Sequence, residues 1–133
     1  DITYIMLNNG DVCYLHLITD AYSRMIVGWE LADTLRASIT IKALEQAISQ
    51  TGGVSLEGLT HHSDRGVQYC CDDYVRMLQT HKIKISMTED YNPTDNAIAE
   101  RANGVIKTET VYSRKTFNSL EHARNVIGRF MHF

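Results

Sequence analysis

The amino-acid sequence predicts an α/β fold in which a mixed five-stranded sheet carries helices on both faces. The first observation is a series of three apolar segments separated by polar turns, at residues 3–7, 12–18 and 25–31. The second is the alternation that follows, with helical patterns at residues 38–50 and 72–81 and strand patterns at residues 59–62 and 83–87. A meander predicts antiparallel strands, and helix-strand alternation predicts parallel strands added to the same sheet.

Turn residues define the antiparallel meander. Asn8, Asn9 and Gly10 tolerate the positive φ that a tight hairpin needs, and they separate the first two apolar segments. A polar turn at residues 20–24 then leads into the third segment. We therefore expect three consecutive antiparallel strands.

Apolar residues at helical spacing predict the helices. Within residues 38–50, Ile41, Leu44 and Ile48 fall on one side, and Ser38 is a candidate N-cap. Two more helices are expected after the last strand, at residues 96–111 and 120–133.

Length and composition indicate one domain that covers residues 1–133. With 44% hydrophobic residues the chain can bury a core, but it has no apolar run long enough to cross a membrane and no signal-peptide pattern. Its three cysteines form no CxxC pair, which is typical of a reducing compartment. We expect a cytoplasmic protein, and the missing helix stop at the C-terminus suggests a fragment of a longer chain.

The charge distribution bears on nucleic-acid binding. A formal net charge of −3 argues against binding DNA through bulk electrostatics. Basic residues are nevertheless concentrated toward the C-terminal end, where residues 101–133 carry six basic and two acidic side chains. Most of these six are expected simply to lie on solvated helix faces.

Three carboxylates in separate segments form the candidate site. Asp64 follows a predicted strand and precedes Gly66, and Glu100 comes after an interval of 35 residues; Asp1 is the third member. Taken alone, Asp64 would fit an Asx turn or a helix cap. Three hard oxygen ligands together suit a Mg²⁺ site that keeps positions open for water and phosphate oxygens, which indicates metal-assisted phosphoryl transfer.

Glu100 lies on a polar stripe of its predicted helix. On a helical wheel the stripe is opposite the apolar face formed by Ile98, Ala102 and Val105. A solvated face would look similar, but asparagine is a weak helix former and is an unusual choice for such a face. The stripe suits metal ligation and contact with a phosphate backbone. Its other members are Asn96, Asn103 and Lys107.

Other polar residues offer alternative sites. Asp20 also ends a strand, but the residues after it are typical of a turn. His61 and His62 could form a zinc cluster with the nearby cysteines, although their spacing matches no common zinc pattern, and they are better explained as hydrogen-bonded residues of a strand. Tyr69 and Arg65, near Asp64, are candidates for contact with DNA.

Four segments together resemble the integrase catalytic core of bacterial insertion-sequence transposases, which is related to retroviral integrases. The resemblance covers nearly the whole chain. The sequence departs from the family pattern at residues 101–105, where an aromatic-containing stretch is common. The four segments are Asp1-Ile2-Thr3-Tyr4-Ile5, residues 20–29, His62-Ser63-Asp64-Arg65-Gly66 and the stretch from Asp95 to Glu109.

The resemblance implies an RNase H-like fold with Asp1, Asp64 and Glu100 as ligands of two Mg²⁺ or Mn²⁺ ions. It also implies that Lys107 contacts the transposon end, that the substrates are transposon-end and target DNA, and that the intact protein is a homo-oligomer in the bacterial cytoplasm, at the nucleoid. We expect further DNA contacts at other polar residues. These are Asn96, Asn103, Arg65 and Tyr69.

The expected activity is DNA cleavage and strand transfer by in-line displacement, with water or a DNA 3′-hydroxyl as the nucleophile. Such a mechanism needs no covalent intermediate. Two alternatives remain at this point: a nuclease of the same fold that hydrolyses nucleic acid without joining strands, and an inactive DNA-binding or assembly module. The presence of all three acids argues against the second.

Overall fold

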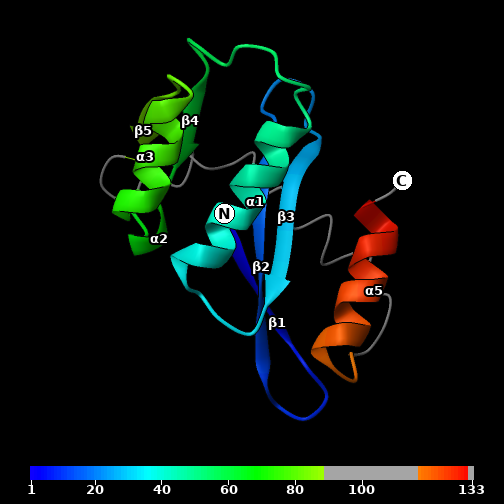
Figure 1. Ribbon diagram of the computed structural model, residues 1–133. Helices are drawn as coiled ribbons and strands as arrows, with labels where there is room; N and C mark the ends of the chain where they lie inside the picture. The colour runs from blue at the N-terminus through cyan, green and yellow to red at the C-terminus, as the bar shows by residue number, and fades with distance from the viewer. Residues whose placement is uncertain (89–116, 132–133) are drawn as a thin grey trace.

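The computed structural model describes residues 1–88 and 117–131 (Figure 1). The helix predicted at residues 96–111 therefore lies outside the described residues. The strands are β1 (Ile2–Met6), β2 (Val12–Thr19), β3 (Ile26–Ala32), β4 (Thr60–Ser63) and β5 (Lys84–Met87). The helices are α1 (Ala37–Ser49), α2 (Val67–Cys70), α3 (Asp72–Thr80) and α5 (Leu120–Met131).

The strands form two sheets rather than one. β1, β2 and β3 make an antiparallel meander, and β4 pairs with β5 in parallel. Both sets of pairings confirm the predicted directions. The prediction of a single five-stranded sheet is wrong for the described residues, because no ladder joins β4 to the meander. The β1–β2 pairing ends at Leu17, whereas β2 continues to Thr19. An open space lies between this last part of β2 and β4, so the two strands do not pair.

The hairpin between β1 and β2 forms where the turn residues predicted it. Gly10 has a φ of +89°, and the Leu7 N–H donates to the carbonyl of Asp11 at 2.7 Å. The turn sets a register in which Tyr4 lies opposite Tyr14, and their rings meet edge to face at a centroid distance of 5.1 Å. Tyr4 remains 59% exposed, so this pair covers the sheet surface without entering the core.

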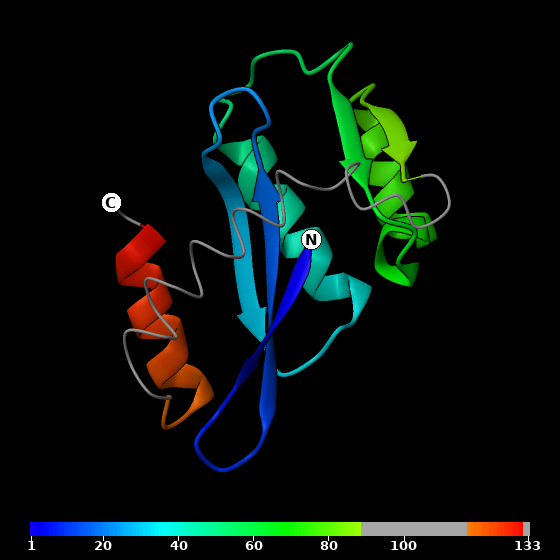
Figure 2. The same ribbon diagram turned by 180° about the vertical axis from the view of Figure 1, so that it is seen from behind.

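Helices cover both faces of the meander, as predicted. Alternate residues of β2 point to opposite faces. Leu15 and Leu17 pack with Ala123 and Ile127 of α5, whereas His16 contacts Thr40 of α1 on the other face. Figures 1 and 2 show α1 lying across the sheet and α5 beside β3.

The outer edge of β3 is closed by side chains from these two helices. The Gln46 side chain accepts from the Trp29 N–H at 3.2 Å and donates to the Trp29 carbonyl at 2.7 Å. Arg124 donates to the carbonyl of Leu31 at 3.0 Å. Because an open strand edge can pair with another chain, these contacts protect the meander on that side.

A second core lies between α1, α3 and the parallel pair. It contains Tyr69, Tyr74 and Leu78, with Leu44 from α1 and Ile83 just before β5. This cluster packs the β4–β5 pair against α1, while no ladder of hydrogen bonds joins the pair to the meander in the described residues. The position of β4 relative to β1 therefore depends on helix packing.

The helix ends differ in detail from the predictions. The predicted cap at Ser38 is wrong, because α1 begins at Ala37 and its N-cap position, Arg36, makes no side-chain capping bond. The short helix α2 was not predicted.

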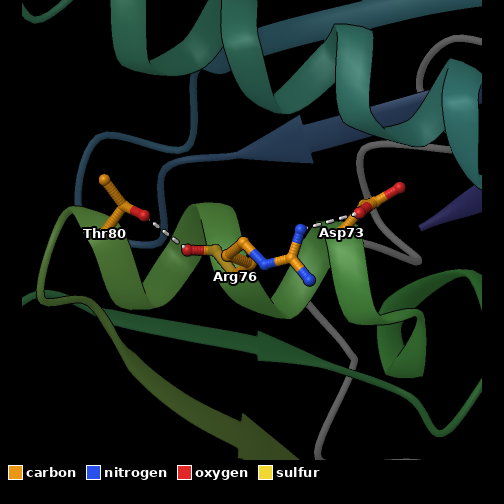
Figure 3. Close-up of polar contacts among 3 residues, drawn as sticks. All are labelled: Asp73, Arg76 and Thr80. Atoms are coloured by element: carbon orange, nitrogen blue, oxygen red, sulfur yellow. Dashed lines mark hydrogen bonds and ion pairs between the residues drawn. The ribbon is translucent and has the colours of Figure 1, made fainter.

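On the outer surface of α3, Arg76 pairs with Asp73 at 3.3 Å and the Thr80 hydroxyl donates to the Arg76 carbonyl at 2.8 Å (Figure 3). Such exposed pairs contribute little to stability. Within residues 1–88 and 117–131, no helix is long and apolar enough to cross a membrane.

Candidate active site

The backbone of Asp1 belongs to the β1–β2 ladder. Its amino group donates to the carbonyl of Leu17 at 2.8 Å, and the Leu17 N–H donates back to the Asp1 carbonyl at 2.8 Å. These two bonds extend the strand pairing by one residue beyond Ile2. The first predicted carboxylate is thus carried by ordered strand backbone.

Asp64 comes directly after the last residue of β4. The Gly66 N–H donates to its Oδ1 at 2.8 Å, and the Ser63 hydroxyl donates to its backbone carbonyl at 2.8 Å. A Cβ at Gly66 would lie 3.0 Å from that same Oδ1, so the turn is too tight for a larger residue without adjustment. One carboxylate oxygen is therefore held by the turn. The local Asx geometry and a role in metal binding are compatible.

Asp1 and the end of β4, the strand that Asp64 follows, line the same cavity although their strands belong to different sheets. Burial lowers the pKa of the Asp1 amino group to about 6, and the nearby Asp64 carboxylate acts in the opposite direction. The same amino group contributes to the lowered pKa of His61. The start of β1 and the end of β4 thus border one cavity, close enough for their charges to interact.

His61 is a structural group at the base of the site. Its Nε2 lies 2.7 Å from the Tyr74 hydroxyl, and burial is the main cause that lowers its pKa to about 4. Its Nδ1 and the hydroxyl of Tyr69 are buried without a hydrogen-bond partner in the described part of the chain. His61 is neutral at pH 7. The sequence carries no signal for its hydrogen bond to Tyr74, because the two residues belong to different elements, β4 and α3.

Tyr69 is buried, which contradicts the predicted contact with DNA. Only 4% of it is exposed, and its ring meets Tyr74 edge to face at a centroid distance of 5.5 Å. Burial also raises the pKa of its hydroxyl. A ring in this position packs the core beneath Asp64 and cannot stack on a base. The short helix α2, which the sequence did not reveal, turns it inward.

Asp20 makes the hydrogen bonds of a turn, as its sequence context predicts. Its carboxylate accepts from the Ser23 hydroxyl at 2.6 Å and from the backbone N–H groups of Tyr22 and Ser23. The Ser23 hydroxyl is also the main cause of its lowered pKa. These contacts satisfy the Asp20 carboxylate locally.

Arg65 and His62 lie on the exposed side of the site. Arg65 donates from Nε to the Thr88 carbonyl at 2.8 Å, which holds the planar end of its side chain against the residue that follows β5. The Nδ1 of His62 lies 2.9 Å from the hydroxyl of Ser86, across the β4–β5 pair. The first contact connects the turn after β4 to the residue after β5, and the second connects the two strands themselves.

The other predicted site residues lie outside the described residues. Among residues 1–88 and 117–131, no group of three His, Cys, Asp or Glu side chains is arranged to hold a metal ion. Two members of the predicted triad, Asp1 and Asp64, are in the described part. Their oxygen donors suit a hard divalent cation. The residues outside it are Asn96, Glu100, Asn103 and Lys107.

Solved structures define the class of fold. The chain is similar to the integrase catalytic core domain of HTLV-2, solved in complex with magnesium, with a TM-score of 0.72 and 22% identity over 98% of this chain and 78% of that one. It is also similar to the Mos1 transposase catalytic domain solved with raltegravir and magnesium, with a TM-score of 0.65 and 16% identity over 99% and 68% of the two chains. The fold is the RNase H-like fold of integrase and transposase cores.

Sequence comparisons give the family. A family model described as integrase core domain matches residues 1–93, and a second model with the same description matches residues 81–132. The chain belongs to the integrase core domain family, which confirms the resemblance stated from its motifs.

The relatives with curated descriptions are about twice as long. A putative transposase for insertion sequence IS986/IS6110 of Mycobacterium tuberculosis (strain ATCC 25177 / H37Ra) is 36% identical over 98% of this chain and 48% of its own length. Transposase InsF for insertion sequence IS3A of Escherichia coli (strain K12) is 31% identical over 98% and 44%. The chain thus spans about half the length of these relatives.

Proposed function

We propose that the chain is the catalytic domain of a DNA transposase that cleaves DNA strands and joins them by metal-dependent phosphoryl transfer. The observation that carries this proposal is that Asp1, just before β1, and the end of β4, which Asp64 follows, border the same cavity in a chain of the integrase core domain family. The transposase descriptions of its relatives and the magnesium in its structural neighbours support it.

The carboxylates would be the ligands of the catalytic metal. We assign Asp1, Asp64 and Glu100 to two Mg²⁺ ions, with Mn²⁺ as a substitute. When bound, such ions polarise the phosphate and lower the pKa of the attacking hydroxyl. The Gly66 N–H fixes Oδ1 of Asp64 at 2.8 Å, which limits rotation of the carboxylate and directs its other oxygen. Bound cations would also offset the repulsion between an acidic chain and DNA.

DNA would reach the site along the outer side of the turn after β4. Arg65 is exposed and anchored through its Nε, so its guanidinium is positioned to meet a phosphate. Lys107, Asn103 and Asn96 are proposed as further DNA contacts on the strength of the family resemblance. Assembly as a homo-oligomer is proposed because the HTLV-2 core was solved in both dimeric and trimeric forms.

The test is a strand-transfer assay with Mg²⁺, using the longer transposase and duplex DNA that carries the terminal repeats flanking its gene. Asp64→Asn should lower both end cleavage and joining by at least about a hundredfold, because it removes a metal ligand and leaves the fold intact. Asp73→Asn is the matched control, since Asp73 lies on the outer surface of α3. Its activity should equal that of the wild type.

The same assay separates the alternatives. Cleavage without any joined product would favour a nuclease of the same fold. Neither cleavage nor joining, with DNA still bound, would favour an inactive binding or assembly module. Equal activity of Asp64→Asn and wild type would reject Asp64 as a metal ligand.

A further inference from the structure

A series of hydrogen bonds connects the turn after β4 to the meander. It begins at Gln68 of α2, whose side-chain Nε2 donates to the carbonyl of Leu35 at 3.0 Å. Leu35 lies in the short segment between β3 and α1. Figures 1 and 2 show α2 level with the first turn of α1. Because the two sheets share no ladder in the described residues, this bond is a direct polar link between their two halves of the molecule.

The segment before α1 is itself bound to β2. His16 of β2 is fully buried, and its Nε2 lies 3.1 Å from the carbonyl of Thr34. A carbonyl can only accept, so Nε2 carries the proton and Nδ1 accepts from the Thr40 hydroxyl at 2.9 Å. Burial lowers the pKa of His16, which is consistent with this neutral form. The carbonyl of Leu35 therefore belongs to a segment that the sheet holds in place.

The same part of β2 holds Asp1. The N–H of Leu17 donates to the Asp1 carbonyl at 2.8 Å, and the Leu17 carbonyl accepts from the Asp1 amino group at 2.8 Å. His16 and Leu17 are consecutive residues of one strand. The segment that accepts from Gln68 and the backbone of Asp1 are thus bound to adjacent positions of β2.

At its other end, Gln68 contacts the turn that holds Asp64. A Cβ at Gly66 would lie 3.0 Å from Oε1 of Gln68, so the amide oxygen packs directly against Gly66. The Gly66 N–H donates to Oδ1 of Asp64 at 2.8 Å. On the opposite side, Arg65 donates to the Thr88 carbonyl. The turn is therefore anchored toward α1 by Gln68 and toward β5 by Arg65.

We propose that Gln68 is a positioning residue, whose side-chain amide sets the place of the Asp64 carboxylate relative to Asp1. This inference rests on the proposed function, because it concerns the same metal ligands. Mg²⁺ requires oxygen ligands at about 2.0–2.1 Å in near-ideal geometry, so a small displacement of one carboxylate weakens binding. Loss of a residue that orients a metal ligand typically lowers metal affinity by about 10–100-fold. Gln68 should therefore act on metal binding and leave DNA binding unchanged.

Amide hydrogen exchange tests the anchor without metal or DNA. The longer transposase, labelled with ¹⁵N-glycine, reports Gly66 and also Gly128 in the interior of α5. Gln68→Met keeps the length of the side chain but removes its amide. Exchange of the Gly66 N–H should become at least about fivefold faster, with Gly128 unchanged. An unchanged Gly66 would overturn the proposal, and so would equal acceleration at both glycines, which would mean a general loss of stability.

Binding of Mn²⁺, followed by the electron paramagnetic resonance of the free ion, tests the consequence. Gln68→Met should raise the Kd for Mn²⁺ at least about tenfold. Gln79→Met is the matched control, because it makes the same chemical change on the exposed side of α3, and its Kd should equal that of the wild type. Asp64→Asn separates the two proposals. If Asp64→Asn also binds Mn²⁺ normally, the proposed function fails together with this inference; if only Asp64→Asn weakens binding, the positioning role alone is rejected.

Strand-transfer kinetics distinguish positioning from direct contact with DNA. Gln68→Met should raise the KM for Mg²⁺ at least about tenfold, while kcat at saturating Mg²⁺ and the KM for DNA stay within about twofold of the wild type. A change confined to the KM for DNA would show that Gln68 contacts DNA itself, and would overturn the proposal.

Discussion

Replacing Gly28 with alanine should destabilise the protein strongly, because β3 and α1 approach each other closely there. A Cβ at position 28 would lie 2.2 Å from the carbonyl oxygen of Ala43 and 3.2 Å from the Cβ of Ala47. Ordinary contacts between such atoms are about 3.5 Å or longer. The helix and the strand would therefore have to separate by roughly 1 Å.

The cost can be worked out from the contacts that such a shift disturbs. Overpacking of this kind costs about 1–3 kcal/mol. Separation would also strain the two hydrogen bonds between Gln46 and Trp29, which contribute about 1 kcal/mol each. Alanine regains about 0.4–1 kcal/mol by restricting the unfolded chain. The net expectation is a loss of about 2–4 kcal/mol in the free energy of unfolding.

Gly128→Ala provides a matched control, because it should raise the free energy of unfolding instead of lowering it. Its added Cβ would lie 3.5 Å from the Trp29 ring, which is an ordinary contact, and it falls within α5. Alanine in a helix interior is worth about 0.5–1 kcal/mol relative to glycine. Urea unfolding followed by circular dichroism measures both variants. If Gly28→Ala lowers the free energy of unfolding by less than about 0.5 kcal/mol, the close approach of α1 to β3 is wrong.

Two further predictions concern buried histidines. The pKa of His61 is about 4 in the folded protein and about 6.5 in the unfolded chain. Between these pH values the unfolded chain binds more protons than the folded protein. The free energy of unfolding should therefore fall by up to about 3 kcal/mol as the pH drops from about 6.5 to about 4. His61→Phe should remove this part of the pH dependence in urea titrations, and an unchanged slope would refute the assignment. The Thr40 hydroxyl lies 2.9 Å from Nδ1 of buried His16, so Thr40→Val should lower the free energy of unfolding by about 1–2 kcal/mol in thermal unfolding. Thr80 is exposed, so Thr80→Val should lower it much less. Equal losses would show that the contact between Thr40 and His16 does not stabilise the protein.

Local structure can be predicted from the sequence where neighbouring residues determine it. Asn9 and Gly10 make the predicted hairpin, and Asp20 satisfies its carboxylate with the turn that follows. The turn after Asp64 depends on Gly66, two residues away. In each case the partners are separated by only a few residues, so sequence order alone brings them together.

Side chains whose environment comes from distant segments were harder to predict. Tyr69 was expected at the DNA surface, but α3 and β4 enclose it. Tyr4 belongs to a strand that packs against the core, yet its ring lies on a part of the sheet that remains exposed. Both residues are apolar rings with a polar tip, which are compatible with either position. Packing decides between the two positions.

By itself, the sequence determined the element types, the antiparallel meander, the parallel pair and the candidate carboxylates, because periodicity and turn chemistry act over a few residues. Only the tertiary structure decided that Asp1 and the end of β4, which Asp64 follows, border the same cavity. It also decided that a cavity lies between β4 and the meander where one continuous sheet was expected. The physical reason is that the contacts of α1 and α3, and not a ladder of hydrogen bonds, place β4 beside β1.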